Sequence, residues 1–128
     1  MRLSALSLII AAMTASTPAM AQERSLTVYT YESFTAEWGP GPRVKEEFEK
    51  SCACRVNFVA VADGVALLSR LKLEGENNEA DIVLGLDTNL AYEAKATGLF
   101  ERHGLDTSPI SVPGGYGDDV FIPYDYGH

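Results

Sequence analysis

The sequence has little of what catalytic and metal-binding proteins commonly use. It contains two cysteines, two histidines and one tryptophan in 128 residues, and it has no G-x-S-x-G motif. His103 and His128 each stand alone, with no second ligand pair near either of them, so no zinc site is predicted. Ser33 has no candidate base close to it in the sequence, which disfavours nucleophilic catalysis. We therefore expect neither a bound metal nor a cofactor.

An excess of positive charge is also missing. The chain has 10 basic and 18 acidic side chains, a formal net charge of −8, and the acidic residues are spread along the sequence rather than gathered in one run. This balance disfavours DNA, RNA and anionic membrane surfaces as partners. A cationic or neutral ligand fits it better, although acidity also serves solubility.

The one apolar stretch, residues 3–16, is too short to span a bilayer, which requires roughly 20 apolar residues. It follows a basic start at Arg2 and precedes the small residues Ala19-Met20-Ala21. This pattern is typical of a cleaved signal peptide. We predict a signal peptide over residues 1–21, a periplasmic location, and one domain over residues 22–128.

The two cysteines, Cys52 and Cys54, are separated by one residue. In an oxidising compartment they form either a structural disulfide or two unreactive thiols. Redox catalysis is disfavoured because the usual redox motif is Cys-x-x-Cys.

Short β-rich runs alternate with helical patterns after the signal peptide. Strands are predicted over residues 26–31, 55–59, 81–84 and 120–124. Helices are predicted from Pro42 with Val44 and Phe48 as its apolar side, from the N-cap Asp63 to Gly75, and from Asp87 to Gly98, with Leu99 packing back. Strands joined by helices predict an α/β fold, a mostly parallel sheet with helices on both faces. The Gly- and Pro-rich residues 108–119 are predicted to form a surface loop.

Ligands of open α/β sheets bind beyond the carboxyl ends of the strands. The candidate residues at those positions combine aromatic rings, carboxylates and glycines: Tyr31, Trp38, Asp63, Gly64, Gly85, Asp87 and Asp125. Aromatic rings beside carboxylates favour an organic cation as the ligand.

Each candidate also has a structural interpretation. Asp63 and Asp87 are predicted N-caps, which does not exclude a ligand role. Trp38 can close the edge of the domain, and the mid-strand Tyr29 is predicted to pack in the core. The carboxylates Asp63 and Asp125 are also compatible with acid/base catalysis, the interpretation that would make this protein an enzyme.

Several motifs resemble the mature N-terminus of the periplasmic thiamine-binding proteins of ABC importers. The most specific runs from Tyr31-Glu32-Ser33-Phe34 to Trp38-Gly39-Pro40-Gly41-Pro42. The others are Cys52-Ala53-Cys54, Asp63-Gly64-Val65, residues 80–87, Thr97-Gly98-Leu99-Phe100, Val112-Pro113-Gly114-Gly115 and residues 123–127.

The resemblance implies the first lobe of a type II periplasmic binding protein, over residues 22–128. Such a protein closes two lobes over thiamine or a thiamine phosphate and delivers it, as a monomer, to an inner-membrane ABC permease. Asp63 and Gly64 match a ligand-contacting turn of that family, and Tyr31 and Trp38 match its pocket less closely. Family members are about three times longer, so the second lobe is expected to be missing from this chain, which ends at His128.

Three alternatives stay open. A polyamine receptor also surrounds a cation with aromatic rings and carboxylates. An iron receptor is less favoured, because no ligand cluster is visible in this part of the chain. A truncated fragment with no binding function is the third.

Overall fold

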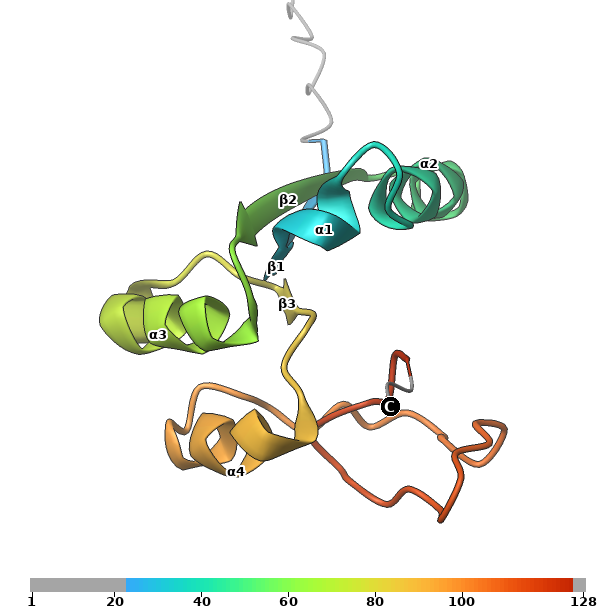
Figure 1. Ribbon diagram of the computed structural model, residues 1–128. Coiled ribbons are helices and arrows are strands. Elements are labelled where there is room, and N and C mark those ends of the chain that lie inside the picture. Colours follow the sequence, from blue (N-terminus) through green and yellow to red (C-terminus); the bar gives the residue numbers. More distant parts are fainter. Residues whose placement is uncertain (1–22, 126–128) are drawn as a thin grey trace, which may run out of the picture.

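The structure is a computed structural model that describes residues 23–125 (Figure 1). The predicted signal peptide, residues 1–21, lies outside the described residues. The elements in chain order are β1 (Ser25–Tyr31), α1 (Glu32–Thr35), α2 (Gly41–Cys52), β2 (Arg55–Val61), α3 (Gly64–Glu74), the 3-10 turn η1 (Gly75–Asn77), β3 (Ile82–Val83) and α4 (Thr88–Ala96). Within residues 23–125, no helix has the length and apolar character required to cross a membrane.

The three strands form one parallel sheet in the order β2-β1-β3. β1 pairs with β2 along its whole length, from Ser25 opposite Arg55 to Tyr31 opposite Val61. On its other side, β1 pairs with the two residues of β3. Each parallel pair needs a crossover connection, and helices supply it between successive strands. The predicted α/β fold with a parallel sheet is therefore confirmed.

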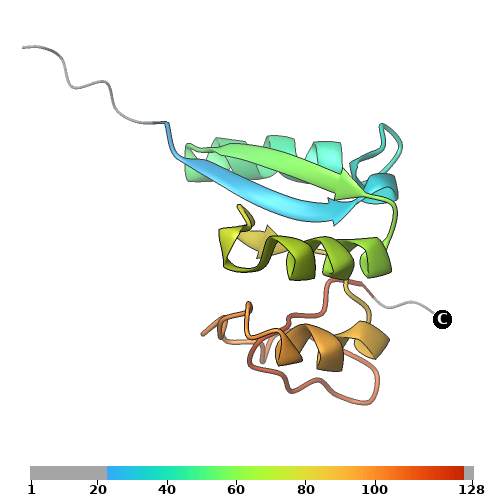
Figure 2. The same ribbon diagram turned by 90° about the vertical axis from the view of Figure 1, so that its left-hand side faces the viewer.

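Helices cover both faces of this sheet, with α2 and α3 on opposite sides of the strands (Figures 1 and 2). On the α3 side, Tyr29 forms a buried cluster with Leu67 and Leu71. On the other side, Phe34 of α1 packs edge-on against Phe58 of β2, with 5.6 Å between the ring centroids. Tyr29 is only 3% exposed, which confirms that it packs in the core.

The ends of α3 and α4 follow the predicted capping residues. Asp63 Oδ1 accepts a hydrogen bond from the Ala66 backbone N–H at 2.8 Å, and α3 ends at Gly75, whose φ is 55°. Asp87 caps α4 in the same way, and Leu99, just beyond that helix, packs against the core cluster of Tyr29, Leu67 and Leu71. Local capping chemistry thus determines where both helices begin.

The predicted apolar side of α2 is only partly covered. Pro42 lies in the first turn as expected, but Val44 and Phe48 remain 48% and 44% exposed. A close approach at the start of the helix holds α2 against α1, since a β-carbon on Gly41 would lie 2.5 Å from the Phe34 carbonyl oxygen. Sequence periodicity found the helix and its apolar side correctly, but the sheet covers less of that side than expected.

Cys52 and Cys54 form a disulfide at the end of α2. Between them, Ala53 has a left-handed conformation with φ of 49°. One turn earlier, Glu49 accepts a hydrogen bond from the Val56 backbone N–H at 2.7 Å. The disulfide therefore belongs to a tight helix-to-strand turn, and of the two alternatives the structural disulfide is the one found.

The predicted strand over residues 120–124 is wrong. Residues 98–125, here called the return segment, contain no helix or strand. Val120 and Phe121 donate their backbone N–H groups to the Asp118 carboxylate instead of to a neighbouring strand. The run stays irregular despite its strand-like composition, because Asp118 accepts the N–H groups of Val120 and Phe121 and Pro123 has no N–H to donate to a strand pairing.

Two smaller differences concern the sheet edge. Sequence reasoning missed α1, because a four-residue helix has too little periodicity to detect. β3 has two residues rather than the four predicted, since only Ile82 and Val83 pair with β1.

Candidate functional site

The carboxyl ends of the three strands lie at one edge of the sheet. Because the strands are parallel and paired in register, Tyr31 of β1 lies opposite Val61 of β2, and β3 ends at Val83 beside Tyr29. The turns that follow the strands, with Asp63, Gly64 and Gly85, therefore meet at this edge, as the ligand rule for open sheets requires.

Asp63 is the exposed N-cap of α3. The cap engages its Oδ1 atom, which accepts the Ala66 N–H at 2.8 Å. The capping bond holds the carboxylate in one orientation at the sheet edge, beside the positive end of the helix dipole. A carboxylate has two oxygens, so capping and the binding of a cation by Asp63 are compatible.

Gly64 and Gly85 let two turns approach closely. A β-carbon on Gly64 would lie 2.6 Å from the Gly85 carbonyl oxygen. A β-carbon on Gly85 would lie 2.2 Å from Cδ1 of the Tyr31 ring. No larger residue fits at either position without movement of the backbone or the ring. The structure thus brings Tyr31, Gly64 and Gly85 together.

Tyr31 lies among aromatic rings and a carboxylate. Its ring centroid is 5.9 Å from that of Phe34, and the Phe34 ring is 5.7 Å from that of Tyr124. Burial raises the pKa of Tyr31 above 10.0, and the nearby Asp125 carboxylate and Tyr124 raise it further. Asp125, at the far end of the described chain, is therefore close enough to Tyr31 to affect its ionisation.

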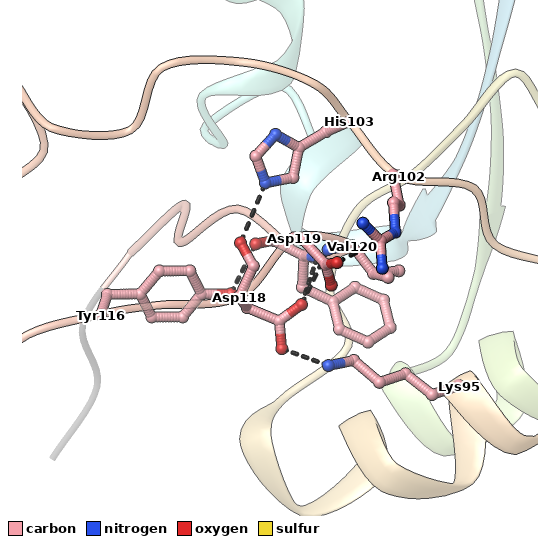
Figure 3. A network of polar contacts seen from close by, with 8 residues as sticks. Lys95, Arg102, His103, Tyr116, Asp118, Asp119 and Val120 are labelled. Carbon is pink, nitrogen blue, oxygen red and sulfur yellow. Dashed lines mark hydrogen bonds and ion pairs between the residues drawn. The ribbon is translucent and has the colours of Figure 1, made fainter.

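Sequence reasoning did not identify the residues that hold Asp125 near Tyr31. Asp118 anchors the return segment: its carboxylate pairs with Lys95 of α4 and accepts the N–H groups of Val120 and Phe121 (Figure 3). The His103 ring contributes a further bond, between its Nε2 and the Asp118 carbonyl oxygen at 3.0 Å. The pKa of Asp118 is lowered to about 2, mainly by the hydrogen bond from Lys95. The backbone hydrogen bonds from Phe121 and Val120 lower it further.

Trp38 is not among the rings that contact one another at this edge. It is 81% exposed, in the loop between α1 and α2. Its role in ligand binding therefore stays a prediction. Gly85, in contrast, has a defined position at the edge: its φ is 114°, and it lies against the Tyr31 ring. A glycine directly after a predicted strand was the available signal for it.

At this edge Asp63 is exposed, while Tyr31 and Gly64 are half-buried. Two hollows of about 380 and 400 Å³ lie elsewhere, one beside the disulfide and one between the C-terminal ends of α3 and α4. Charged side chains of both signs line the first, and no aromatic side chain lines the second, so neither resembles a site for an organic ligand. Within residues 23–125, no group of three His, Cys, Asp or Glu side chains is placed to hold a metal ion.

Comparison with known proteins gives this edge a context. No protein-family model matches the chain. Across 126 residues, which is 98% of this chain and 38% of the relative, the sequence is 59% identical to a thiamine-binding periplasmic protein of Brucella suis. Proteins of the same name are 55% identical over 103 residues in Escherichia coli and 42% identical over 130 residues in Haemophilus influenzae. This chain is homologous to the N-terminal part of the thiamine-binding periplasmic proteins.

Solved structures agree with this assignment. A periplasmic thiamin binding protein matches with a TM-score of 0.79 and 54% identity, covering 82% of this chain and 33% of that one. A Trichodesmium protein solved with iron and citrate matches with a TM-score of 0.52 and 22% identity, a likeness that concerns the fold alone. The chain thus spans about 38% of the length of the curated relatives it matches. The names of these relatives confirm the periplasmic location predicted from the sequence.

Proposed function

We propose that residues 22–128 form the first lobe of a monomeric periplasmic solute-binding protein. In this proposal the lobe binds thiamine or a thiamine phosphate at the carboxyl edge of its sheet, and a second lobe closes over the ligand. The closed protein delivers the ligand to an inner-membrane ABC permease. The function is binding and transport rather than catalysis.

One observation carries the proposal: Tyr31 at the end of β1, the Asp63-Gly64 turn after β2, and Asp125 come from three separate segments to one edge of the sheet. Thiamine contains a permanently cationic thiazolium ring and a flat aminopyrimidine. Ring faces attract such a cation, and a carboxylate attracts it more strongly where water is partly excluded. The acidic chain, with a net charge of −8, favours the same ligand.

A single lobe exposes one side of any ligand to water. Ligand sites of this kind bury most of the ligand surface, which one open edge cannot do. We therefore expect this chain alone to bind thiamine weakly. A two-lobed form, in which this chain is followed by the C-terminal part of the Escherichia coli relative, is expected to bind it tightly.

Isothermal titration of thiamine into both proteins tests the proposal. Strong binding by the two-lobed form and weak binding by the chain alone is the expected result. Titration with thiamine phosphate, thiamine diphosphate and spermidine in parallel identifies the preferred ligand. Preference for spermidine would identify the protein as a polyamine receptor instead. If neither protein binds any of these ligands, the interpretation as a non-functional fragment remains.

Asp63→Asn separates the two roles of Asp63. Asn is as good an N-cap as Asp, so α3 is expected to remain stable. The charge that attracts a cation is lost, so thiamine affinity of the two-lobed form should fall about tenfold or more. Asp87→Asn is the matched control, because Asp87 caps α4 by the same contact. A thiamine affinity of Asp63→Asn equal to that of the unaltered protein would show that Asp63 acts only as a cap.

A further inference from the structure

The backbone of Gly85 lies between two neighbours at the edge of the sheet. Toward β1, a β-carbon on Gly85 would lie 2.2 Å from Cδ1 and 2.6 Å from Cε1 of the Tyr31 ring. Real β-carbons do not approach other atoms so closely. The ring of Tyr31 therefore occupies the space that any other residue at this position would need.

On its other side, Gly85 lies close to Gly64, the first residue of α3. A β-carbon on Gly64 would lie only 2.6 Å from the Gly85 carbonyl oxygen. β2 and β3 are the outer strands, and β1 lies between them. The turn after β3 thus meets the turn after β2 across the end of β1. Gly85 therefore lies close to both the Tyr31 ring and the turn that begins α3.

We propose that Gly85 is a positioning residue for Tyr31: by having no side chain, it lets the Tyr31 ring lie at the end of β1, where the ring meets the cationic ligand. This inference rests on the proposed function and adds to it. It assigns Gly85 no contact of its own with the ligand.

The other neighbours of the ring explain why its position matters. Phe34 lies 5.9 Å away between centroids, and Phe34 is itself 1% exposed and held in the core. Burial raises the pKa of the Tyr31 hydroxyl, and Asp125 contributes to the rise. A ring displaced by a side chain at position 85 cannot move into Phe34, so it moves toward solvent and loses its place beside Asp125.

The test uses Gly85→Ala with a matched control. Gly85 has a φ of 114°, so an alanine there is strained by its backbone as well as by the ring. Gly98→Ala serves as the control: Gly98 also has a positive φ, 70°, but no heavy atom lies within 4 Å of its would-be β-carbon. Gly98→Ala therefore shows the cost of an alanine at a positive φ without a contact, and the double-mutant cycle with Tyr31→Ala isolates the contact itself.

The first measurement is the ionisation of Tyr31 in this chain, without any ligand. It is read from the ultraviolet absorbance of tyrosinate as the difference between each protein and its Tyr31→Phe version. In Gly85→Ala we expect the Tyr31 pKa to fall toward 10, because the displaced ring is more exposed and farther from Asp125. Gly98→Ala should leave it unchanged. An unchanged Tyr31 pKa in Gly85→Ala overturns the proposal.

The second measurement is a double-mutant cycle on thiamine affinity in the two-lobed form. Gly85→Ala is expected to weaken binding about tenfold or more. The double variant Tyr31→Ala with Gly85→Ala should bind less than about twofold more weakly than Tyr31→Ala alone. The reason is that the ring through which Gly85 acts is already absent. Equal losses in both backgrounds would show that Gly85 acts independently of Tyr31, and this would refute the positioning role.

Two outcomes keep the tests distinct. If Gly85→Ala does not fold, Tyr31→Ala added to it should restore folding by removing the clash, and failure to restore folding counts against Tyr31 as the contact. If even the unaltered two-lobed form does not bind thiamine, the proposed function fails. The ligand-free titration of Tyr31 then still decides whether Gly85 positions the ring.

Discussion

The sheet with α3 and the return segment are stabilised in different ways. In the first region, backbone ladders join three strands, and fully buried side chains such as Leu67 and Leu71 fill the space beneath them. In the return segment, residues 98–125, Leu99 and Phe100 pack against that core, and beyond them a few polar side chains bond to the backbone, with Asp118 at the centre (Figure 3). Both regions contribute to the proposed site, the first through Tyr31, Asp63 and Gly64 and the second through Asp125.

This difference separates apolar burial from charge as a source of stability. Burial stabilises the sheet at any pH at which the protein folds. The return segment depends on an ionised carboxylate, so protonation weakens it. The two regions are therefore expected to respond differently to mutation and to acid.

The largest effect is expected from Leu67→Ala in the sheet region. Leu67 is 0% exposed, so its truncation leaves a cavity and should lower the free energy of unfolding by about 3 kcal/mol. Urea denaturation followed by circular dichroism measures the change. Leu73→Ala in the same helix is the control, because Leu73 is 88% exposed and its loss should change stability by less than about 0.5 kcal/mol. Similar losses for the two variants would contradict a core centred on Leu67.

Asp118→Ala should loosen the return segment and leave the sheet intact. Removing the carboxylate deprives the N–H groups of Val120 and Phe121 of their acceptor, which should cost about 1–2 kcal/mol locally. Amide hydrogen exchange is expected to speed up at these two residues but not in β1. Asp119→Ala is the control, because its pair with Arg102 is exposed to solvent. Faster exchange throughout the sheet would show that the two regions unfold together.

Acid should loosen the return segment, as Asp118→Ala does, because it protonates the same carboxylate. In the folded protein the pKa of Asp118 is about 2, below its ordinary value of 3.8, so folding favours the charged carboxylate. The stabilisation is complete above about pH 4 and is lost as the pH falls toward 2. The amide chemical shifts of Val120 and Phe121 should follow this titration. Asp118→Asn should abolish it, and a midpoint near 3.8 in the unaltered protein would contradict the role of Lys95.

The smallest effect is expected from the disulfide. Its ring closes over Ala53 alone, so it restricts the unfolded chain little, and Cys52→Ser with Cys54→Ser should lower stability by about 1 kcal/mol. Thermal unfolding of this double variant, compared with the unaltered protein, measures the loss. A loss above about 3 kcal/mol would mean that the turn between α2 and β2 organises the whole sheet.

Much of the sheet region was predictable from local sequence. The caps Asp63 and Asp87, the stops near Gly75 and Gly98, and the starts of β1 and β2 were all found, because capping and apolar periodicity act within a few residues. The return segment was predicted less well. Val120 to Tyr124 have strand-like composition, but a strand needs a partner, and local sequence does not reveal whether one is free.

The same distinction applies to the site. Sequence placed Tyr31, Asp63 and Gly64 at strand ends, and the parallel sheet then determined that they share one edge. It did not show that Gly85 lies against Tyr31, that Asp125 acts on Tyr31, or that Lys95 and Asp118 hold the segment carrying Asp125. These contacts join residues 23 to 94 positions apart.

By itself, the sequence determined the alternation of strands and helices, the ends of two helices and the similarity to thiamine-binding proteins, because these depend on neighbouring residues and on motifs. The tertiary structure decided the irregular course of residues 98–125, the partial exposure of Val44 and Phe48, and the close packing of Gly64, Gly85 and Tyr31. The reason is that a hydrogen-bond partner or a steric limit supplied by a distant segment leaves no pattern in the local sequence.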